Sequence, residues 1–163
     1  MDLNPGDLVD HRYVVEKRIG EGGMAEVYRV RHVHLETQHA LKVLTVGGKS
    51  LQRRLMQEGR VQAAMQHPNI VAVTDVVMVQ GSPGLVMEYV TGPPMDDFLR
   101  LATPGLDEVD ALAVGILDGV AAAHRLDLIH RDLKPANVML AIVGDHLVPK
   151  LSLIHISEPT RPY

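Results

Sequence analysis

The sequence predicts an α+β fold, in which an antiparallel β-sheet with one main helix comes first and a mostly α-helical, incomplete part follows. Three observations support this prediction. Short runs rich in β-branched and aromatic residues dominate residues 13–90. One helical repeat of apolar side chains interrupts these runs at residues 50–66, and a longer helical repeat follows at residues 107–126. Strands and helices are thus largely segregated along the chain, which is typical of α+β proteins.

The composition fits one soluble domain. The chain has 163 residues, of which 46% are hydrophobic and 22% charged, and its net charge of −4 gives no sign of nucleic-acid binding. The lack of cysteine excludes disulfides and thiolate metal sites. Residues 1–7 do not form a secretory signal, and charged residues interrupt the most apolar stretch, 106–128. We expect a cytoplasmic segment without nucleic-acid or membrane partners, which leaves a membrane anchor elsewhere in a longer protein open.

A leader and three strands are predicted first. Residues 1–12 show no periodic pattern and are expected to be irregular. Residues 13–19 are rich in β-formers and run into glycines. Residues 26–31 alternate apolar with charged side chains, and residues 39–44 form a third β-rich run.

The first helix is predicted over residues 50–66. Ser50 is its expected N-cap, and the sequence His-Pro-Asn at residues 67–69 ends it. The residues that recur near helical spacing are Leu51, Leu55, Val61 and Met65.

Two further strands and a connector follow. The strands are predicted at residues 70–79 and 85–90, around a turn at residues 81–84. Residues 91–94, Thr-Gly-Pro-Pro, read as a connector and a natural boundary between two parts of the chain.

The second part begins with the long helix over residues 107–126. Its expected apolar face consists of Val109, Leu112, Ile116 and Val120. Short strands are predicted within residues 129–140 and at residues 147–151.

The octapeptide His-Arg-Asp-Leu-Lys-Pro-Ala-Asn at residues 130–137 carries groups that phosphoryl transfer needs. Asp132 supplies a carboxylate to orient a hydroxyl, Lys134 a cation for phosphate, and Asn137 an oxygen ligand for magnesium. The spacing matches the signature H-R-D-x-x-x-x-N. The octapeptide therefore resembles the catalytic loop of protein kinases, and Lys134 is similar to the serine/threonine type.

This resemblance covers residues 13–151 and implies a bacterial, eukaryotic-like serine/threonine protein kinase. Such an enzyme transfers the γ-phosphoryl group of ATP to protein Ser/Thr hydroxyls, with ATP and Mg²⁺ as cofactors. Residues 13–90 would form the small lobe and the start of the hinge, residues 91–151 part of the large lobe, and residues 152–163 a tail outside the kinase. In these terms Asp132 is the catalytic base, Lys134 neutralises the γ-phosphate and Asn137 binds the metal.

A glycine cluster between the first two predicted strands resembles the phosphate-covering loop of kinases, G-x-G-x-x-G-x-V. Glycines allow backbone amides to approach phosphate oxygens closely. Ala25 replaces the third glycine, and an ordinary hairpin turn is the alternative interpretation. The nucleotide-binding positions implied here are Gly20, Glu21, Gly22, Gly23 and Val27.

Two other segments complete the implied nucleotide site. The run Ala40-Leu41-Lys42 is similar to the V-A-I-K strand motif, in which the lysine holds the α- and β-phosphates and a helix glutamate, here Glu58, holds the lysine. Unrelated surface charges are the alternative for this pair. Residues 86–90 resemble the hinge, where the backbone of Glu88 and Val90 would bond adenine. Asp97 either reaches the ribose hydroxyls or is a solvated residue at a helix start.

The sequence after residue 151 departs from the kinase pattern. The strand that ends there should lead to the D-F-G aspartate, the main magnesium ligand, but the next position holds Leu153. Residues 151–161 also resemble a translated sequencing adapter, so we expect the reading frame to leave a kinase gene here, with a natural, diverged terminus as the alternative. Either way we expect a chain that is poorly soluble or partly unfolded and lacks phosphotransferase activity, because its long helix has few packing partners.

Two rival functions are considered. A pseudokinase, meaning a nucleotide-binding scaffold without catalysis, is favoured by Leu153 but disfavoured by intact Lys42, Asp132 and Asn137. A small-molecule phosphotransferase of related fold is disfavoured by the Lys-Pro pair at residues 134–135. Zinc binding by His32, His34 and His39 lacks a fourth ligand, so we expect these to be solvent-facing strand residues.

Overall fold

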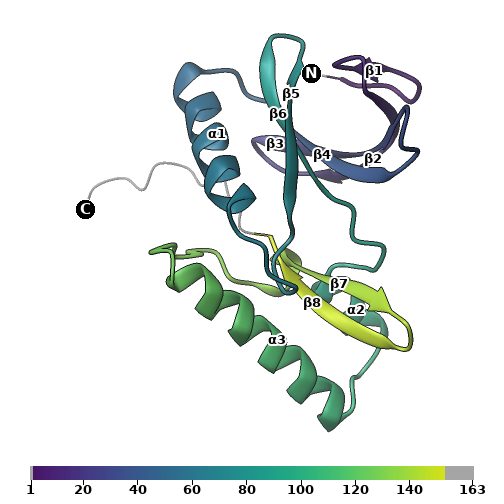
Figure 1. Cartoon of the computed structure of the whole chain (residues 1–163). Coiled ribbons are helices and arrows are strands. Elements are labelled where there is room, and N and C mark those ends of the chain that lie inside the picture. The colour runs from purple at the N-terminus through teal and green to yellow at the C-terminus, as the bar shows by residue number, and fades with distance from the viewer. Residues whose placement is uncertain (1, 153–163) are drawn as a thin grey trace. The chain divides into compact units, whose positions relative to one another are not determined.

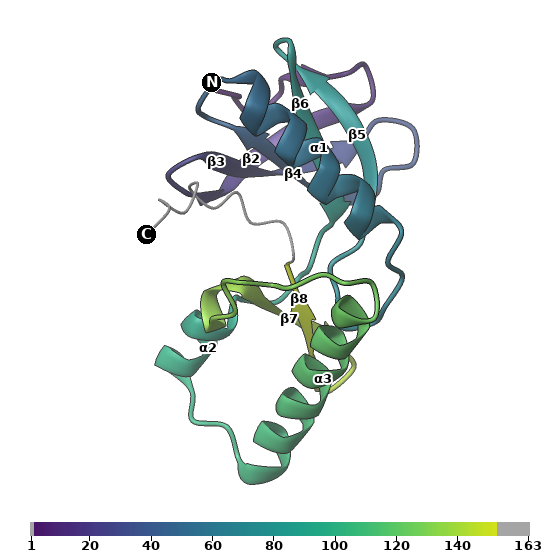
Figure 2. The ribbon, with the colours of Figure 1, turned by 90° about the vertical axis from the view of Figure 1, so that its left-hand side faces the viewer.

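The computed structural model describes residues 2–152, which form two compact units. The first unit holds residues 2–63 and 73–89, and the second holds Ala64–Ala72 and residues 90–152. Two chain crossings near residues 63 and 73 therefore precede the one between Tyr89 and Val90. The elements of both units are shown in Figures 1 and 2.

A six-stranded antiparallel sheet forms the first unit, with the strand order β1-β2-β3-β4-β6-β5 (Figure 1). The strands predicted at residues 13–19, 26–31 and 39–44 are confirmed, and each gains one or two residues at its ends. The elements of this unit are β1 (Leu8–Val9), β2 (Tyr13–Glu21), β3 (Ala25–His32), β4 (Gln38–Leu44), α1 (Lys49–Ala63), β5 (Val73–Val79) and β6 (Ser82–Glu88).

The core of the first unit lies on one face of this sheet. Alternation along β3 buries Glu26, Tyr28 and Val30 on that face. The aliphatic and aromatic residues that pack with Tyr28 and Val30 are Val9, Tyr13, Val15, Leu41, Val43, Val77, Val79 and Val86. Each such side chain contributes roughly 1.5–3 kcal/mol relative to exposure, so aliphatic packing compensates for the scarcity of aromatic residues.

Helix α1 packs on the opposite face of the sheet (Figure 2). A Cβ atom on Gly59 would lie 2.6 Å from Leu85 Cδ2 of β6, so this close approach depends on glycine. Leu55 of the same helix is fully buried. The helix therefore covers the part of β6 that pairs with the middle of β4.

The prediction of an irregular leader is wrong, because the leader adds a strand to the sheet. β1 pairs antiparallel with the start of β2, where Val9 lies opposite Tyr13. Val9 is buried in the core, and Leu3 packs against that core. A two-residue strand is too short to show a periodic pattern, which explains why the sequence did not reveal it.

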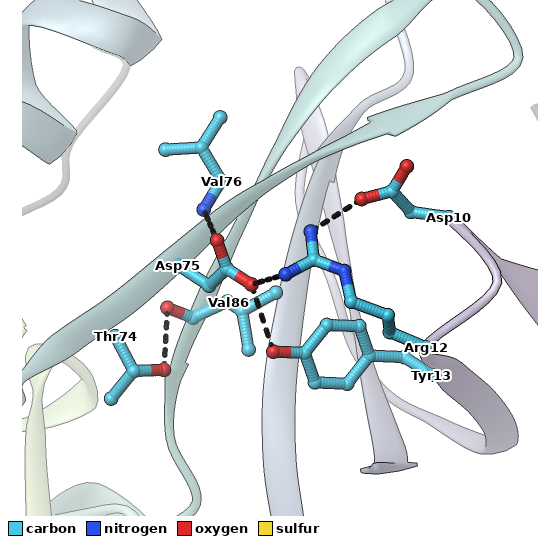
Figure 3. Close-up of polar contacts among 7 residues, drawn as sticks. All are labelled: Asp10, Arg12, Tyr13, Thr74, Asp75, Val76 and Val86. Carbon is cyan, nitrogen blue, oxygen red and sulfur yellow. Dashed lines mark hydrogen bonds and ion pairs between the residues drawn. The ribbon is translucent and has the colours of Figure 1, made fainter. Parts of the chain in front are cut away.

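A polar cluster fastens this segment to β5 (Figure 3). Arg12 Nη1 donates to Asp75 Oδ2 over 2.6 Å, and the guanidinium also pairs with Asp10. The Tyr13 hydroxyl donates to the same Asp75 oxygen over 3.0 Å, while Val76 N donates to Asp75 Oδ1 over 2.8 Å. Burial first, and the hydrogen bond to Asp75 second, raise the pKa of Tyr13 to about 12. Asp75 therefore accepts three hydrogen bonds, and the two from Arg12 and Tyr13 link β5, an edge strand of the sheet, to the start of β2.

The predicted N-cap of the first helix is wrong. α1 begins at Lys49, so Ser50 lies within its first turn. Gly48 precedes the helix with φ +147°, a conformation that glycine adopts without steric cost. Glycine at the helix entrance replaces the side-chain cap that the sequence suggested.

The turn and the strands around β5 also differ from the prediction. The turn lies at Gln80 and Gly81, with φ +48° and +82°, so residue 82 already belongs to β6. β5 begins at residue 73 instead of 70, because Ile70 forms a parallel bridge with Leu151 in the second unit. A short-range pattern cannot show that Ile70 has such a distant partner.

A long helix packed on a two-stranded sheet forms the second unit (Figure 1). Its elements are α2 (Met95–Leu101), α3 (Leu106–His124), a 3-10 turn η1 (Pro135–Asn137), β7 (Val138–Val143) and β8 (His146–Leu151). β7 and β8 form an antiparallel pair, with Val138 opposite Leu151. Residue 153 onward, including the tail for which we expect an adapter origin, lies outside the described residues.

The buried face of α3 differs from the predicted one. Leu112 is buried, and Ile116 and Val120 pack with it in a cluster that also holds Met95, Phe98, Val138, Leu140, Leu147 and Leu151. These three residues therefore have packing partners, contrary to our expectation. Val109 is 43% exposed and does not belong to that face.

Two glycines of α3 set this face. A Cβ on Gly115 would lie 2.6 Å from Pro149 Cγ, and one on Gly119 would lie 2.8 Å from Asn69 O.

No helix among the described residues is long and apolar enough to span a membrane.

Candidate active site

One face of the first unit's sheet gathers several of the predicted nucleotide-binding residues. Val27 of β3 lies opposite Lys42 of β4, and Lys42 lies opposite Leu85 of β6. Because directly paired residues point to the same face, these three side chains are neighbours. Ala40, which is buried and two residues from Lys42, shares this face.

The glycine cluster forms a hairpin between β2 and β3. Gly20 and Glu21 end β2, where Gly20 pairs with Val27, and Gly22 N donates to Ala25 O over 2.9 Å across the turn. None of these glycines has a positive φ, and a Cβ on Gly23 would have no heavy atom within 4 Å. The fold itself therefore does not require glycine at position 23, and the space beside it is open to a ligand.

Lys42 and Glu58 influence each other's ionisation, so the structure brings them close together. Burial lowers the pKa of Lys42 to about 8, and the charge of Glu58 opposes this shift. Burial raises the pKa of Glu58, opposed by the charges of Lys42 and Arg54. Lys42 keeps part of its surface exposed, yet the desolvation of its ammonium group dominates. Glu58 Oε2 is buried and accepts no hydrogen bond from the described residues.

Such a pair is costly for folding and typical of functional sites. Both pKa shifts have burial as their largest cause, which means that the fold destabilises the charged form of each group relative to water.

The loop at residues 130–137 holds its three chemical groups against one another. Lys134 Nζ lies 3.0 Å from Asp132 Oδ2. Asn137 Nδ2 donates to Asp132 Oδ2 over 3.0 Å and to Asp132 O over 2.7 Å. Since Nδ2 faces Asp132, the carboxamide Oδ1, which can ligate a cation, points the other way. The Asp132 and Lys134 side chains are 46% and 53% exposed, so solutes can reach them.

Two hydrogen bonds with the backbone of Ser152 fasten this loop to the residue after β8. The buried His130 bonds through Nε2 to Ser152 O over 3.0 Å, and Ser152 N donates to Asn137 O over 3.1 Å. Burial lowers the pKa of His130, which keeps the ring neutral at pH 7 with its proton on Nε2. Arg131 has φ +61°, a conformation that costs a residue with a side chain on the order of 1 kcal/mol. The loop is therefore held by its ends and strained at Arg131.

The predicted hinge residues fall on both sides of the unit boundary. Glu88 is the last residue of β6 and pairs with His39, whereas the buried Val90 is the first residue of the second unit's later segment. Asp97 lies in the first turn of α2, is exposed, and forms an ion pair with Arg100 over 3.2 Å. This contact agrees with a solvated residue at a helix start, and the ribose role stays a prediction.

The structure therefore forms two groups of predicted site residues. Gly20–Val27, Ala40, Lys42, Glu58 and Glu88 belong to the first unit, and Val90, Asp97, Asp132, Lys134 and Asn137 belong to the second. Sequence reasoning missed the buried Glu26, although a carboxylate on the apolar side of an alternating strand was visible as a signal.

The three clustered histidines do not form a metal site, since the described residues contain no group of three His, Cys, Asp or Glu that could hold an ion. His32 and His39 instead pack edge-on against the Tyr13 ring, at centroid distances of 5.1 and 5.6 Å. His32 and His39 are therefore partly buried packing residues, whereas His34 is exposed as expected, although it lies in a turn.

Comparison with known proteins gives one family. A family model described as the protein kinase domain matches residues 13–152. A probable serine/threonine-protein kinase of Streptomyces coelicolor is 38% identical over 141 residues, which are 82% of this chain and 21% of that protein. The serine/threonine-protein kinase PknL of Mycobacterium tuberculosis is 35% identical over 151 residues, which are 90% of this chain and 38% of PknL. The chain thus spans between about a fifth and two fifths of the length of these curated relatives.

The same likeness holds in three dimensions. A crystal structure of the Mycobacterium tuberculosis PknI kinase domain, a double mutant, matches with a TM-score of 0.77 and 30% identity. The match covers 99% of this chain and 66% of that domain. The predicted kinase-like α+β fold is confirmed, with an antiparallel sheet and one main helix followed by the first helices of a mostly helical part.

Proposed function

Since this chain belongs to the protein kinase domain family, and its curated relatives are serine/threonine protein kinases, we propose that it carries the ATP site and catalytic loop of such an enzyme. The observation that carries this proposal is the contact of Asp132 with both Lys134 and Asn137 in one partly exposed loop. A carboxylate, an ammonium and a carboxamide within hydrogen-bonding distance are the groups that phosphoryl transfer uses. The assignment of residues 13–90 and 91–151 to kinase lobes belongs to this proposal.

The first unit would hold the nucleotide phosphates. The glycine hairpin offers backbone amides beside open space at Gly23, and Lys42 offers an ammonium whose hydration has been removed. Glu58 would orient Lys42, because its carboxylate is the charge that acts on that ammonium. The backbone at Glu88 and at Val90 would bond adenine.

The catalytic loop would act on the acceptor hydroxyl. Protein kinases in general use ATP, which supplies the γ-phosphoryl group, together with Mg²⁺, which neutralises the charge of the phosphates. Asp132 would accept a hydrogen bond from a Ser or Thr hydroxyl and orient it for attack. Lys134 would leave its contact with Asp132 to face a phosphate, and its flexible, exposed side chain permits this.

The metal ligands fit only in part. Asn137 turns its amide nitrogen to Asp132, which leaves its oxygen for a cation. The second family ligand is an aspartate, and position 153 holds leucine, which lies outside the described residues. We therefore expect nucleotide binding with weak dependence on Mg²⁺ and little phosphoryl transfer by this chain.

A titration of the purified chain with a fluorescent ATP analogue tests nucleotide binding. We expect binding that Lys42→Met weakens about tenfold or more, because the variant removes the only ammonium on the paired strands β3, β4 and β6 of the described sheet. The exposed Lys17→Met serves as the control and should leave the affinity unchanged. An affinity that is the same in all three proteins would contradict the proposal.

A pseudokinase is the second candidate function, and Leu153 favours it. A peptide phosphorylation assay with radiolabelled ATP separates the two. Nucleotide binding without phosphoryl transfer by a complete kinase domain that contains these residues would identify a scaffold, whereas transfer abolished by Asp132→Asn would identify a kinase.

A further inference from the structure

Glu26 is a buried carboxylate that the proposed chemistry does not use. Its side chain is 8% exposed and lies on the core side of β3, next to Tyr28. An ionised carboxylate in such a place is unfavourable unless hydrogen bonds and a cation compensate for it. Its presence in an otherwise apolar row of β3 therefore calls for a specific partner.

Two side chains compensate for this charge. The Tyr28 hydroxyl donates to Glu26 Oε2 over 2.6 Å, and Arg18 Nη1 donates to Glu26 Oε1 over 3.0 Å. These contacts lower the pKa of Glu26, and the hydrogen bond from Tyr28 has a larger effect than that from Arg18. Glu26 is therefore ionised at neutral pH and rigidly held, since Tyr28 is itself fully buried.

Arg18 extends this anchor to the glycine hairpin. Its other nitrogen, Nη2, lies 3.4 Å from Glu21 Oε2. Glu21 is the last residue of β2 and pairs across the hairpin with Glu26. The guanidinium thus contacts both members of the pair that lies next to the turn, Glu21 and Glu26. The register of β2 shifts nearby, between Arg18 and Gly20.

The turn beyond this point has little support of its own. One hydrogen bond runs across it, from Gly22 N to Ala25 O, and Met24 O accepts a second from Thr45 N, just after β4. A Cβ atom on Gly23 would have no heavy atom within 4 Å. A glycine-rich turn is conformationally permissive, so its shape depends on what holds its base.

We propose that Arg18 is a positioning residue that, anchored on the buried Glu26, holds residues 20–25 in the shape that receives nucleotide phosphates. The inference rests on the proposed nucleotide site. Arg18 acts through the hairpin and does not itself contact the nucleotide.

The decisive variant is Glu26→Gln in the full 163-residue chain. Glutamine keeps the shape and can still accept from Tyr28, but it loses the charge that holds Arg18. We expect the Gly22 amide to exchange with deuterium about fivefold faster, and the affinity for a fluorescent ATP analogue to fall about threefold, which are effects typical of losing one partly exposed ion pair. Amides in the middle of β4 should exchange at an unchanged rate, which separates a loosened hairpin from general unfolding.

A matched control exists on the same two strands. Glu16→Gln removes ion pairs with Arg29 and Arg31, which lie away from the turn, and should change neither the Gly22 exchange nor the affinity. If Glu26→Gln does not fold, Arg18→Met tests the same contact at a half-exposed position and should give the same changes. Unchanged Gly22 exchange in these variants would overturn the inference. A parent chain that binds no ATP analogue would instead refute the proposed function, and the exchange data would still decide the role of Arg18.

Discussion

Lys42 is held in a state that opposes folding. Its pKa falls from 10.5 to about 8 because the fold removes water from the ammonium group. At pH 7 the charged form persists on both sides of the folding equilibrium, and the folded state carries the full cost of desolvation. A side chain that is retained in spite of this cost is better explained by ligand binding than by stability.

The pH dependence of stability tests this interpretation. Between pH 8 and 10.5 the unfolded chain keeps the Lys42 proton while the folded chain releases it, so stability should rise with pH across this window. Urea denaturation should show that the free energy of unfolding of the parent chain, relative to that of Lys42→Met, rises across this pH window by on the order of 2 kcal/mol. Subtracting the variant removes the contribution of the other titrating groups. A difference that stays constant with pH would contradict the lowered pKa.

Asp132, Lys134 and Asn137 lie within six residues of one another, which is why their proximity could be read from the sequence. Their hydrogen bonds are local and need only the 3-10 turn at residues 135–137 to form. The coupling of Lys42 to Glu58 depends instead on packing α1 against the sheet, and only the family resemblance suggested it. Arg18 and Glu26 belong to no motif that we recognised, and their contact required the structure.

At the scale of single elements, α3 shows how a partner decides which face of a helix is buried. The period of the apolar residues suggested a face that begins at Val109, but nearly every side of this helix carries apolar residues, so the period was ambiguous. Val114 and Leu117 are 58% and 65% exposed, and the glycines at positions 115 and 119 face β8 and the segment around Asn69. Close approach, not hydrophobicity, selected the buried side.

Gly119→Ala tests this close approach. Alanine favours an exposed helix by about 1 kcal/mol, yet its Cβ here would meet Asn69 O at 2.8 Å and Leu151 Cδ1 at 2.9 Å. We expect a net destabilisation of roughly 1–3 kcal/mol in urea denaturation followed by circular dichroism. Gly105→Ala, at the N-cap of the same helix and in open space, should cost less than about 1 kcal/mol, because alanine only caps a helix less well than glycine does. A stabilised Gly119→Ala would mean that the helix does not approach this closely.

Element boundaries were predictable where the pattern was local and long enough. β2, β3 and β4 followed from β-rich runs of six or more residues, whereas β1 is only two residues long. The start of α1 was missed because a glycine replaces the capping side chain, and the start of β5 was missed because Ile70 pairs with a residue 81 positions further along.

At the scale of the whole molecule, the leader belongs to the folded domain although the family match begins only at Tyr13. Val9 is buried, Leu3 packs on the core, and Arg12 bonds Asp75 of β5. A chain that starts at Tyr13 should therefore unfold at a lower urea concentration, with a loss of about 2–4 kcal/mol from the exposed core and the lost hydrogen bonds.

Two point variants assign this loss. Val9→Ala should cost about 1–3 kcal/mol, whereas Leu8→Ala, which is 54% exposed in the parent chain, should cost less than about 0.5 kcal/mol. Equal stability of the short and full chains would show that the leader does not contribute to folding.

The path of the chain between its two units limits how the protein can be divided. A single break between Tyr89 and Val90 would leave Ala64–Ala72 attached to the wrong piece. The separated C-terminal piece would then lack Asn69 and Ile70, whose backbone pairs with that of Leu151. It would also lose the hydrogen bond from the Asn69 side-chain amide to Pro149 O. If the two halves were expressed from separate genes, the N-terminal half would have to supply these nine residues to the C-terminal half. The segment could therefore be used to control reassembly in a split reporter.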